Sequence, residues 1–220
     1  MDAGYAHDYP RYRKELAWAG IDVKDMRALV LSHHHDDHAG FLNELTRDTP
    51  VTIIAHEQAR VLLESGKNDR SRGGGYINGF IKFAAGIKMR LNPGWTLTFS
   101  PFTLRESDIL LAGDHNQILR ELGIAGQILY TPEHCIDHLS IVLDNGEAFC
   151  GDLAANFLLW AGTHYCTVFM TDMDETYRSW QKMLDTGAQV IHPAHGRPFP
   201  ADKLRQNMGR IHTEALAKFF

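Results

Sequence analysis

Short apolar runs alternate with longer amphipathic segments in the first and last thirds of the chain. Residues 28–31 and 51–55 are almost entirely apolar and end at polar clusters, which predicts buried strands that lead into loops. Helices are expected at residues 10–19, 38–45, 57–64, 172–186 and 201–220, and further strands at 95–99, 109–111, 127–131, 139–143, 147–150 and 188–191. This alternation predicts a layered α/β protein.

Local turn and cap signals refine this pattern. Asp144-Asn145-Gly146 lies between two of the expected strands and predicts a hairpin with a type I′ turn. Asp37 precedes the expected helix at 38–45 and is placed to cap it. Residues 67–75 combine mixed charges with three consecutive glycines, which predicts an exposed loop, either a simple connector or a flap over a cleft.

The length, charge and cysteine content of the chain exclude several classes of protein. The 220 residues suit one domain spanning 1–220, and the net charge of −5 argues against a protein that mainly grips nucleic acid. No apolar stretch approaches the ~20 residues of a membrane span, so neither a nucleic acid nor a membrane is expected as a partner. Three cysteines cannot all pair within one chain, which favours the reducing cytoplasm.

Thirteen histidines are many for this length, and four of them lie within residues 33–38, His-His-His-Asp-Asp-His. Residues two apart in an extended loop point the same way, so His33 and His35 can approach one metal ion, with Asp37 and His38 directed to a second position. His34 and Asp36 should point away from them. Imidazole and carboxylate groups are ligands that zinc and iron accept.

Three later motifs place a ligand-type residue where an expected strand ends. They are Thr131-Pro132-Glu133-His134, Gly151-Asp152 and His192-Pro193-Ala194-His195-Gly196. Strand ends are where α/β sheets build their sites. His138 lies four residues after His134, but a hydrogen bond to a ligand or to the backbone suits it better than metal binding.

The order HxHxDH, TPxH, GD and PxHG resembles the metallo-β-lactamase superfamily, whose fold is an αββα sandwich with a dinuclear metal site. The resemblance implies two divalent ions, with zinc expected and iron or manganese as alternatives. It assigns seven ligands: His33, His35 and His134 to the first ion, Asp37, His38 and His195 to the second, and Asp152 as a bridge.

The resemblance implies a hydrolase that uses a hydroxide bridging the two metals on a small ester, lactone, thioester or phosphoester. Asp37 would be the catalytic proton shuttle, and His115, His164 and Tyr165 are candidates for substrate contact. The alternative is a metal-binding or redox protein on the same scaffold, such as a mono-iron sulfur dioxygenase-like protein, or a truncated homologue with little activity.

The start of the chain departs from the family pattern. Family members open with strands that lead into an Asp-x-Gly segment, whereas this sequence begins at Met1-Asp2-Ala3-Gly4. A fold that is short at its N-terminus would leave an unpaired sheet edge. We therefore expect either a homodimer that covers this edge or a start codon upstream of Met1.

Overall fold

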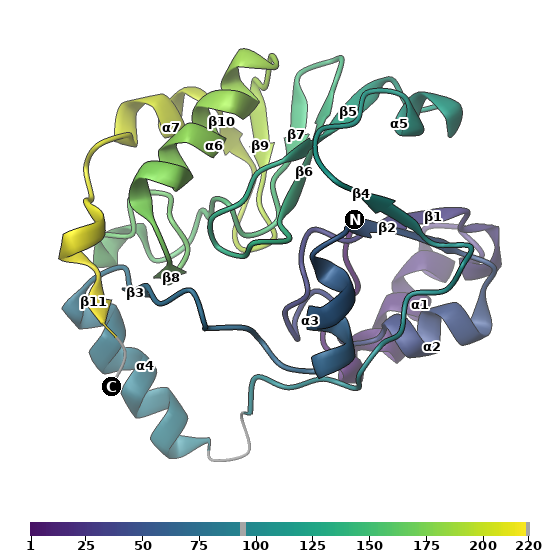
Figure 1. Ribbon diagram of the computed structural model, residues 1–220, viewed down its shortest axis with the longest axis horizontal. Helices are drawn as coiled ribbons and strands as arrows, with labels where there is room; N and C mark the ends of the chain where they lie inside the picture. The colour runs from purple at the N-terminus through teal and green to yellow at the C-terminus, as the bar shows by residue number, and fades with distance from the viewer. Residues whose placement is uncertain (93–95, 219–220) are drawn as a thin grey trace. The chain divides into compact units, whose positions relative to one another are not determined.

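A computed structural model describes residues 1–92 and 96–218 (Figure 1). The chain divides into two compact units. Unit 1 comprises Met1–Asp69 and Leu97–Ala112, and unit 2 comprises Arg70–Thr96 and Gly113–Phe220.

Unit 1 is built on a parallel sheet in the order β1-β2-β4. Its strands are β1 (Ala28–Val30), β2 (Thr52–His56) and β4 (Ile109–Leu111); its helices are α1 (Tyr9–Trp18), α2 (Leu42–Asp48) and α3 (Ala59–Ser65), with short 3₁₀ turns η1 (Ala6–Asp8) and η2 (Val23–Asp25). Leu29 and Ile53, from β1 and β2, join the same core as residues from all three helices, while Val30 and Ile54 on the alternate positions are also buried. Burial on both faces explains why these strands are continuous apolar runs in the sequence.

Unit 2 is built on a five-stranded sheet in the order β10-β9-β7-β6-β5. These strands are β5 (Gly126–Tyr130), β6 (Leu139–Leu143), β7 (Glu147–Phe149), β9 (Val190–His192) and β10 (Phe199–Pro200). A small second sheet, in the order β11-β3-β8, contains β3 (Gly75–Tyr76), β8 (Phe169–Met170) and β11 (Ala217–Lys218). The helical segments are α4 (Gly79–Leu91), α5 (Ile118–Glu121), α6 (Met173–Asp185), α7 (Asp202–Asn207), η3 (Leu159–Ala161) and η4 (Thr213–Ala215).

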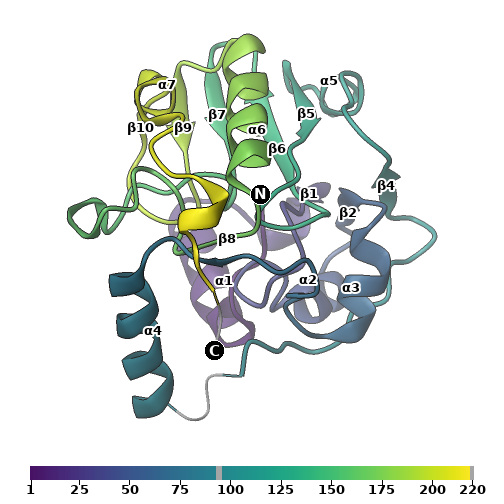
Figure 2. The ribbon, with the colours of Figure 1, turned by 60° about the vertical axis from the view of Figure 1, so that its left-hand side comes forward.

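Helix α6 covers the five-stranded sheet (Figures 1 and 2). Asp172 caps its start by accepting from the backbone N–H groups of Asp174 and Glu175. Trp180 is fully buried in the core of unit 2, and its Nε1 donates to the carbonyl of Leu153 at 2.8 Å. This hydrogen bond ties α6 to the loop that follows β7, where Asp152 lies.

Three sequence predictions about single elements are wrong in detail. The helix expected at 38–45 begins only at Leu42, after Phe41, so Asp37 does not cap it. The helix expected at 201–220 ends at Asn207, because Met208 leaves the helical region (ψ 138°) and Gly209 follows with a positive φ. Of the strand expected at 95–99, residue 95 lies outside the described residues, and Thr98 makes only an isolated bridge to Lys67.

The hairpin at Asp144-Asn145-Gly146 is confirmed, but its turn differs from the prediction. Leu143 and Gly146 close the turn through a backbone hydrogen bond of 2.9 Å. Gly146 has a φ of +89°, whereas neither Asp144 nor Asn145 is among the described residues with positive φ, which type I′ needs at both central positions. The connection is therefore a three-residue loop in which the glycine takes the left-handed position.

Candidate metal centre

The loop after β1 carries four of the predicted ligands and is held by the start of the chain. Asp2 accepts hydrogen bonds from the backbone N–H of Ser32 at 2.6 Å and from its hydroxyl at 2.9 Å. Its Oδ2 also lies 3.1 Å from Nδ1 of His38. Ala3 adds a backbone hydrogen bond to His38 and a bridge to Ala39. Asp2 thus positions both ends of the loop.

The four predicted ligands of unit 1 gather within this loop. The ring centre of His33 lies 4.5 Å from that of His35 and 4.1 Å from that of His38. Because a carboxylate only accepts, Nδ1 of His38 donates to Asp2, so Nε2 is the nitrogen of this ring that could bind a metal ion. That Nε2 lies 3.7 Å from Oδ1 of Asp37.

The two alternate residues of the motif turn to a different neighbour, as the extended-loop argument predicts. Nε2 of His34 accepts from the backbone N–H of Asp69 at 2.9 Å. The side chain of Asp36 accepts from Nδ2 of Asn68 at 2.7 Å. Burial raises the pKa of Asp36, and the hydrogen bond from Asn68 opposes that rise. His34 and Asp36 therefore brace the loop against residues 68–69.

The three predicted ligands of unit 2 follow three different strands. Because β5 and β7 are each antiparallel to β6, and β7 is parallel to β9, the strands β5, β7 and β9 all run in one direction. Their C-terminal ends therefore meet at one edge of the sheet. The ligands that follow these strands are His134, Asp152 and His195, in that order.

The Asp152 carboxylate presents a different oxygen to each histidine of unit 2. Its Oδ2 lies 3.6 Å from Nε2 of His134, and its Oδ1 lies 3.3 Å from Nε2 of His195. Two ligand atoms on one tetrahedral ion, each at ~2.0–2.1 Å, lie ~3.3–3.4 Å apart. Both spacings are close to this value, so these donors fit an arrangement in which Asp152 shares one ion with each histidine. More generally, the chain carries histidine, cysteine and aspartate groups that could hold a metal ion.

Hydrogen bonds from neighbouring groups orient the predicted ligands of unit 2. Because a carbonyl only accepts, Nδ1 of His134 donates to the carbonyl of Phe169 at 3.1 Å, with the Thr167 hydroxyl 3.4 Å away. Nε2 of His138 accepts from the backbone N–H of Asp152 at 3.3 Å, and its Nδ1 lies 3.0 Å from the hydroxyl of Thr131. The predicted outer role of His138 matches these contacts.

Sequence reasoning missed two carboxyl groups near the predicted ligands, the partly buried Asp2 and the fully buried Glu133. Burial opposes ionisation of Asp2, but the neighbouring His38 and the N-terminal amine bring its pKa below the ordinary value. Burial raises the pKa of Glu133 to about 7, although its Oε1 accepts from the backbone N–H groups of Thr171 and Asp172. The only available signals were the position of Asp2 in an Asp-x-Gly segment and the place of Glu133 beside a predicted ligand.

The three candidates for substrate contact lie in unit 2, and their role there stays a prediction. Nδ1 of His115 accepts from the backbone N–H of Ile118 at 3.1 Å, so this side chain also caps α5. His164 and Tyr165 both have positive φ values, and the Tyr165 ring lies 4.7 Å from that of Phe199.

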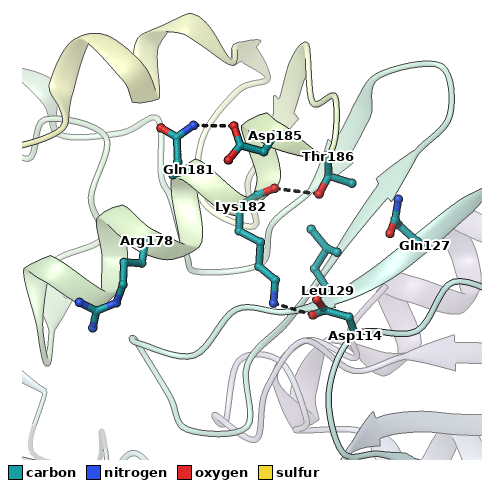
Figure 3. A pocket seen from close by; sticks show the side chains of 8 residues that line it. All are labelled: Asp114, Gln127, Leu129, Arg178, Gln181, Lys182, Asp185 and Thr186. Atoms are coloured by element: carbon teal, nitrogen blue, oxygen red, sulfur yellow. Dashed lines mark hydrogen bonds and ion pairs between the residues drawn. The ribbon is translucent and has the colours of Figure 1, made fainter.

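A surface depression beside α6 does not contain any of the seven predicted ligands (Figure 3). Its polar groups largely satisfy one another: Lys182 pairs with Asp114 at 2.6 Å, and Gln181 donates to Asp185 at 2.6 Å. Because these side chains pair with one another, they are not directed at a ligand. The depression is therefore not a candidate catalytic site.

Comparisons with known proteins agree with the motif pattern. The family model of the metallo-beta-lactamase superfamily matches residues 1–195. A hydroxyacylglutathione hydrolase from Idiomarina loihiensis is 27% identical over 135 residues, which are 61% of this chain and 35% of that protein. A beta-lactamase-like protein 2 homolog from Drosophila melanogaster is 35% identical over 82 residues, 37% of this chain and 25% of that protein. The chain thus matches only about a third or less of the length of these curated relatives.

Among solved structures, an archaeal metallo-beta-lactamase superfamily protein from Sulfolobus tokodaii has a TM-score of 0.59 at 18% identity. The match covers 95% of this chain and 73% of that one. At this level of identity the likeness is one of fold, and it confirms the predicted α/β metallo-β-lactamase fold class.

Proposed function

Because the chain belongs to the metallo-β-lactamase superfamily, we propose that it is a metal-dependent hydrolase in which seven residues hold two divalent ions. The seven are the ligands that the sequence motifs assign, four in unit 1 and three in unit 2. Zinc suits a set of histidine and aspartate donors, and iron and manganese are alternatives.

The observation that carries this proposal is the geometry of Asp152. A carboxylate that faces His134 with one oxygen and His195 with the other is arranged to bridge two ions. A site for a single ion would need only one of these oxygens.

The residues around the ligands have distinct roles in this proposal. Two divalent ions bound there would supply a hydroxide at neutral pH and stabilise negative charge on the substrate. Asp37 lies beside the metal-binding nitrogen of His38 and would accept and return the proton. Asp2 holds His38, and the carbonyl of Phe169 holds His134, in the tautomer that directs Nε2 towards the ion.

For the substrate we propose a small ester, lactone, thioester or phosphoester. The name of the Idiomarina relative makes acylglutathione thioesters the first compounds to assay. All three cysteines are buried thiols, which accords with a reducing compartment such as the cytoplasm.

The test combines elemental analysis of the purified chain with a panel of ester, lactone, thioester and bis-nitrophenyl phosphate substrates. We expect zinc-dependent turnover of at least one class. Replacing Asp152 with asparagine keeps the shape of the side chain but removes its charge. The loss of activity should exceed the ~100-fold that is typical of outer contacts.

The matched control is Asp144→Asn in the hairpin turn before β7, where the carboxylate is half exposed and pairs with Arg120. It should leave activity unchanged. A single bound iron with oxygen consumption, or full activity of Asp152→Asn, would overturn the proposed hydrolase.

A further inference from the structure

Helix α4 presents apolar side chains on two different faces. Ile81 is buried and Ala85 packs against the core of unit 2. Met89 is 41% exposed on another side of the helix, and four other apolar residues of the helix are exposed to 46–74%: Phe80, Phe83, Ile87 and Leu91. At 3.6 residues per turn these four lie within an arc of about 80°. The helix therefore carries a continuous apolar stripe that the core of unit 2 does not use.

The stripe has positive charge on both sides. Arg90 lies next to Phe83 around the helix, and Lys88 lies beyond Leu91 on the opposite side. Residues 79–91 contain three basic residues and no acidic one, although the whole chain has a net charge of −5. The positive charge of α4 is thus a local feature that opposes the charge of the rest of the protein.

An exposed tryptophan extends the stripe. Trp160 in η3 is 77% exposed, and its ring meets that of Phe80 edge to face at 5.6 Å. Asn78, which caps α4, also donates to the carbonyl of Ala161 at 2.8 Å and so joins the two segments. Figures 1 and 2 show the C-terminal end of α4 directed away from the five-stranded sheet of unit 2. We call Phe80, Phe83, Ile87, Leu91 and Trp160, with Arg90 at their edge, the α4 patch.

We propose that the α4 patch binds the surface of an anionic phospholipid bilayer. Helices that lie in a membrane interface combine Phe, Leu and Trp on one face with flanking Lys and Arg. Tryptophan is enriched at the headgroup level, where Trp160 would lie. The cations of α4 complement anionic headgroups, and the absence of acidic residues from the helix removes the opposing repulsion.

The sequence expectation of no membrane partner rested on the lack of a spanning segment. Within residues 1–92 and 96–218 no helix is both long and apolar enough to cross a bilayer. A helix that lies on the surface needs only one apolar face, so the proposal revises that expectation and does not conflict with the lack of a spanning helix.

A second copy of the chain fits the α4 patch less well. A 13-residue helix is ~20 Å long and ~10 Å wide, so its stripe covers ~200 Å². A stable interface buries about 800 Å² on each partner. Pairing two stripes would also bring the basic residues of two helices together.

The test is co-sedimentation of the whole chain with vesicles of phosphatidylcholine alone and with 30% phosphatidylserine. Binding is expected only to the anionic vesicles and should weaken with salt. Trp160→Ala and the pair Phe83→Ser, Ile87→Ser should each lower the partition coefficient at least tenfold. Arg90→Glu should lower it by about fivefold or more, since each basic residue near the surface contributes about that factor.

Trp18→Ala is the matched control, because Trp18 is 90% exposed but lies on α1 in unit 1. It should bind anionic vesicles like the parent chain, and circular dichroism should show that all variants fold. The proposal is overturned if the parent chain does not sediment with anionic vesicles, or if the serine pair binds as well as the parent. It is also overturned if the serine pair instead abolishes a dimer measured by ultracentrifugation, which would make the patch an interface between two copies.

Discussion

The two units supply their candidate ligands in opposite ways. Unit 1 takes all four from six consecutive residues, 33–38, in a single loop after β1. Unit 2 takes three from loops after β5, β7 and β9, spread over residues 134–195. The first set depends on the conformation of one loop, whereas the second depends on the pairing of a whole sheet.

The two units also differ in the groups that form hydrogen bonds with their predicted ligands. In unit 1 a side chain, that of Asp2, holds both Ser32 and His38. In unit 2 a backbone carbonyl, that of Phe169, holds His134. A side-chain partner can be removed by one substitution, but a backbone partner remains. The local site should therefore be the more fragile of the two.

The largest effect is expected on the stability of unit 1, at the ion pair between Asp108 and Arg105. The side chain of Asp108 is fully covered, accepts from the backbone N–H of Ile53 and pairs with Arg105. Asp108→Asn should lower the free energy of unfolding by about 3 kcal/mol, because hydrogen bonds to a charged acceptor are lost beside a partly buried Arg105. Glu106→Gln, an exposed neighbour, should change it by less than ~0.5 kcal/mol. Equal unfolding curves for the two variants would show that this pair does not stabilise unit 1.

The same pair predicts a pH dependence. Burial opposes ionisation of Asp108, but the hydrogen bonds from Arg105 and Ile53 hold its pKa below the ordinary value. A lowered pKa gives stability that is present above the unfolded pKa of ~3.9 and lost as the pH falls through the folded value. Denaturation at several pH values should therefore show the difference between wild type and Asp108→Asn constant above about pH 5 and shrinking below about pH 4. A difference that grows towards acid pH would contradict this sign.

The next effect is expected at Asp2. Asp2→Asn keeps a residue that tolerates the φ of 65° at this position but removes the charge that faces His38. Metal affinity or activity should fall about 10–100-fold, the usual range for an outer partner of a histidine ligand. Asp8→Asn, in the same terminal segment, is the control and should have no such effect. Titration with metal in the presence of a competing chelator measures the metal affinity of both variants.

The sequence predicts contacts between residues close together in the chain better than contacts between distant ones. The turning of His34 and Asp36 away from His33 and His35 follows from alternation along a loop. The hydrogen bonds from Asp2 could not be predicted in this way, because Asp2 lies 30 residues from Ser32 in the chain.

The predicted length of the last helix is too great for a similar reason. Tyr177 on α6 donates to the carbonyl of Ile211 and accepts from its N–H, and these tertiary contacts hold the chain beyond Asn207 outside a helix.

The smallest effect is expected at Thr167 in unit 2. Thr167→Val removes the hydroxyl that lies 3.4 Å from Nδ1 of His134, but the carbonyl of Phe169 still accepts from that nitrogen. Metal affinity should fall by less than about tenfold, below the range for outer partners. If Thr167→Val weakened metal binding as much as Asp2→Asn, the two units would not differ in the way proposed.

The proposed function assigns ligands from both units to the same two ions, and counting metal ions per chain tests that assignment most directly. His35→Ala in unit 1 and His134→Ala in unit 2 each remove a ligand assigned to the first ion. Elemental analysis should give about two ions for the wild type and about one for each variant. The double variant should also keep about one, because both changes remove the same ion. A double variant with none, or single variants that keep two, would contradict the account.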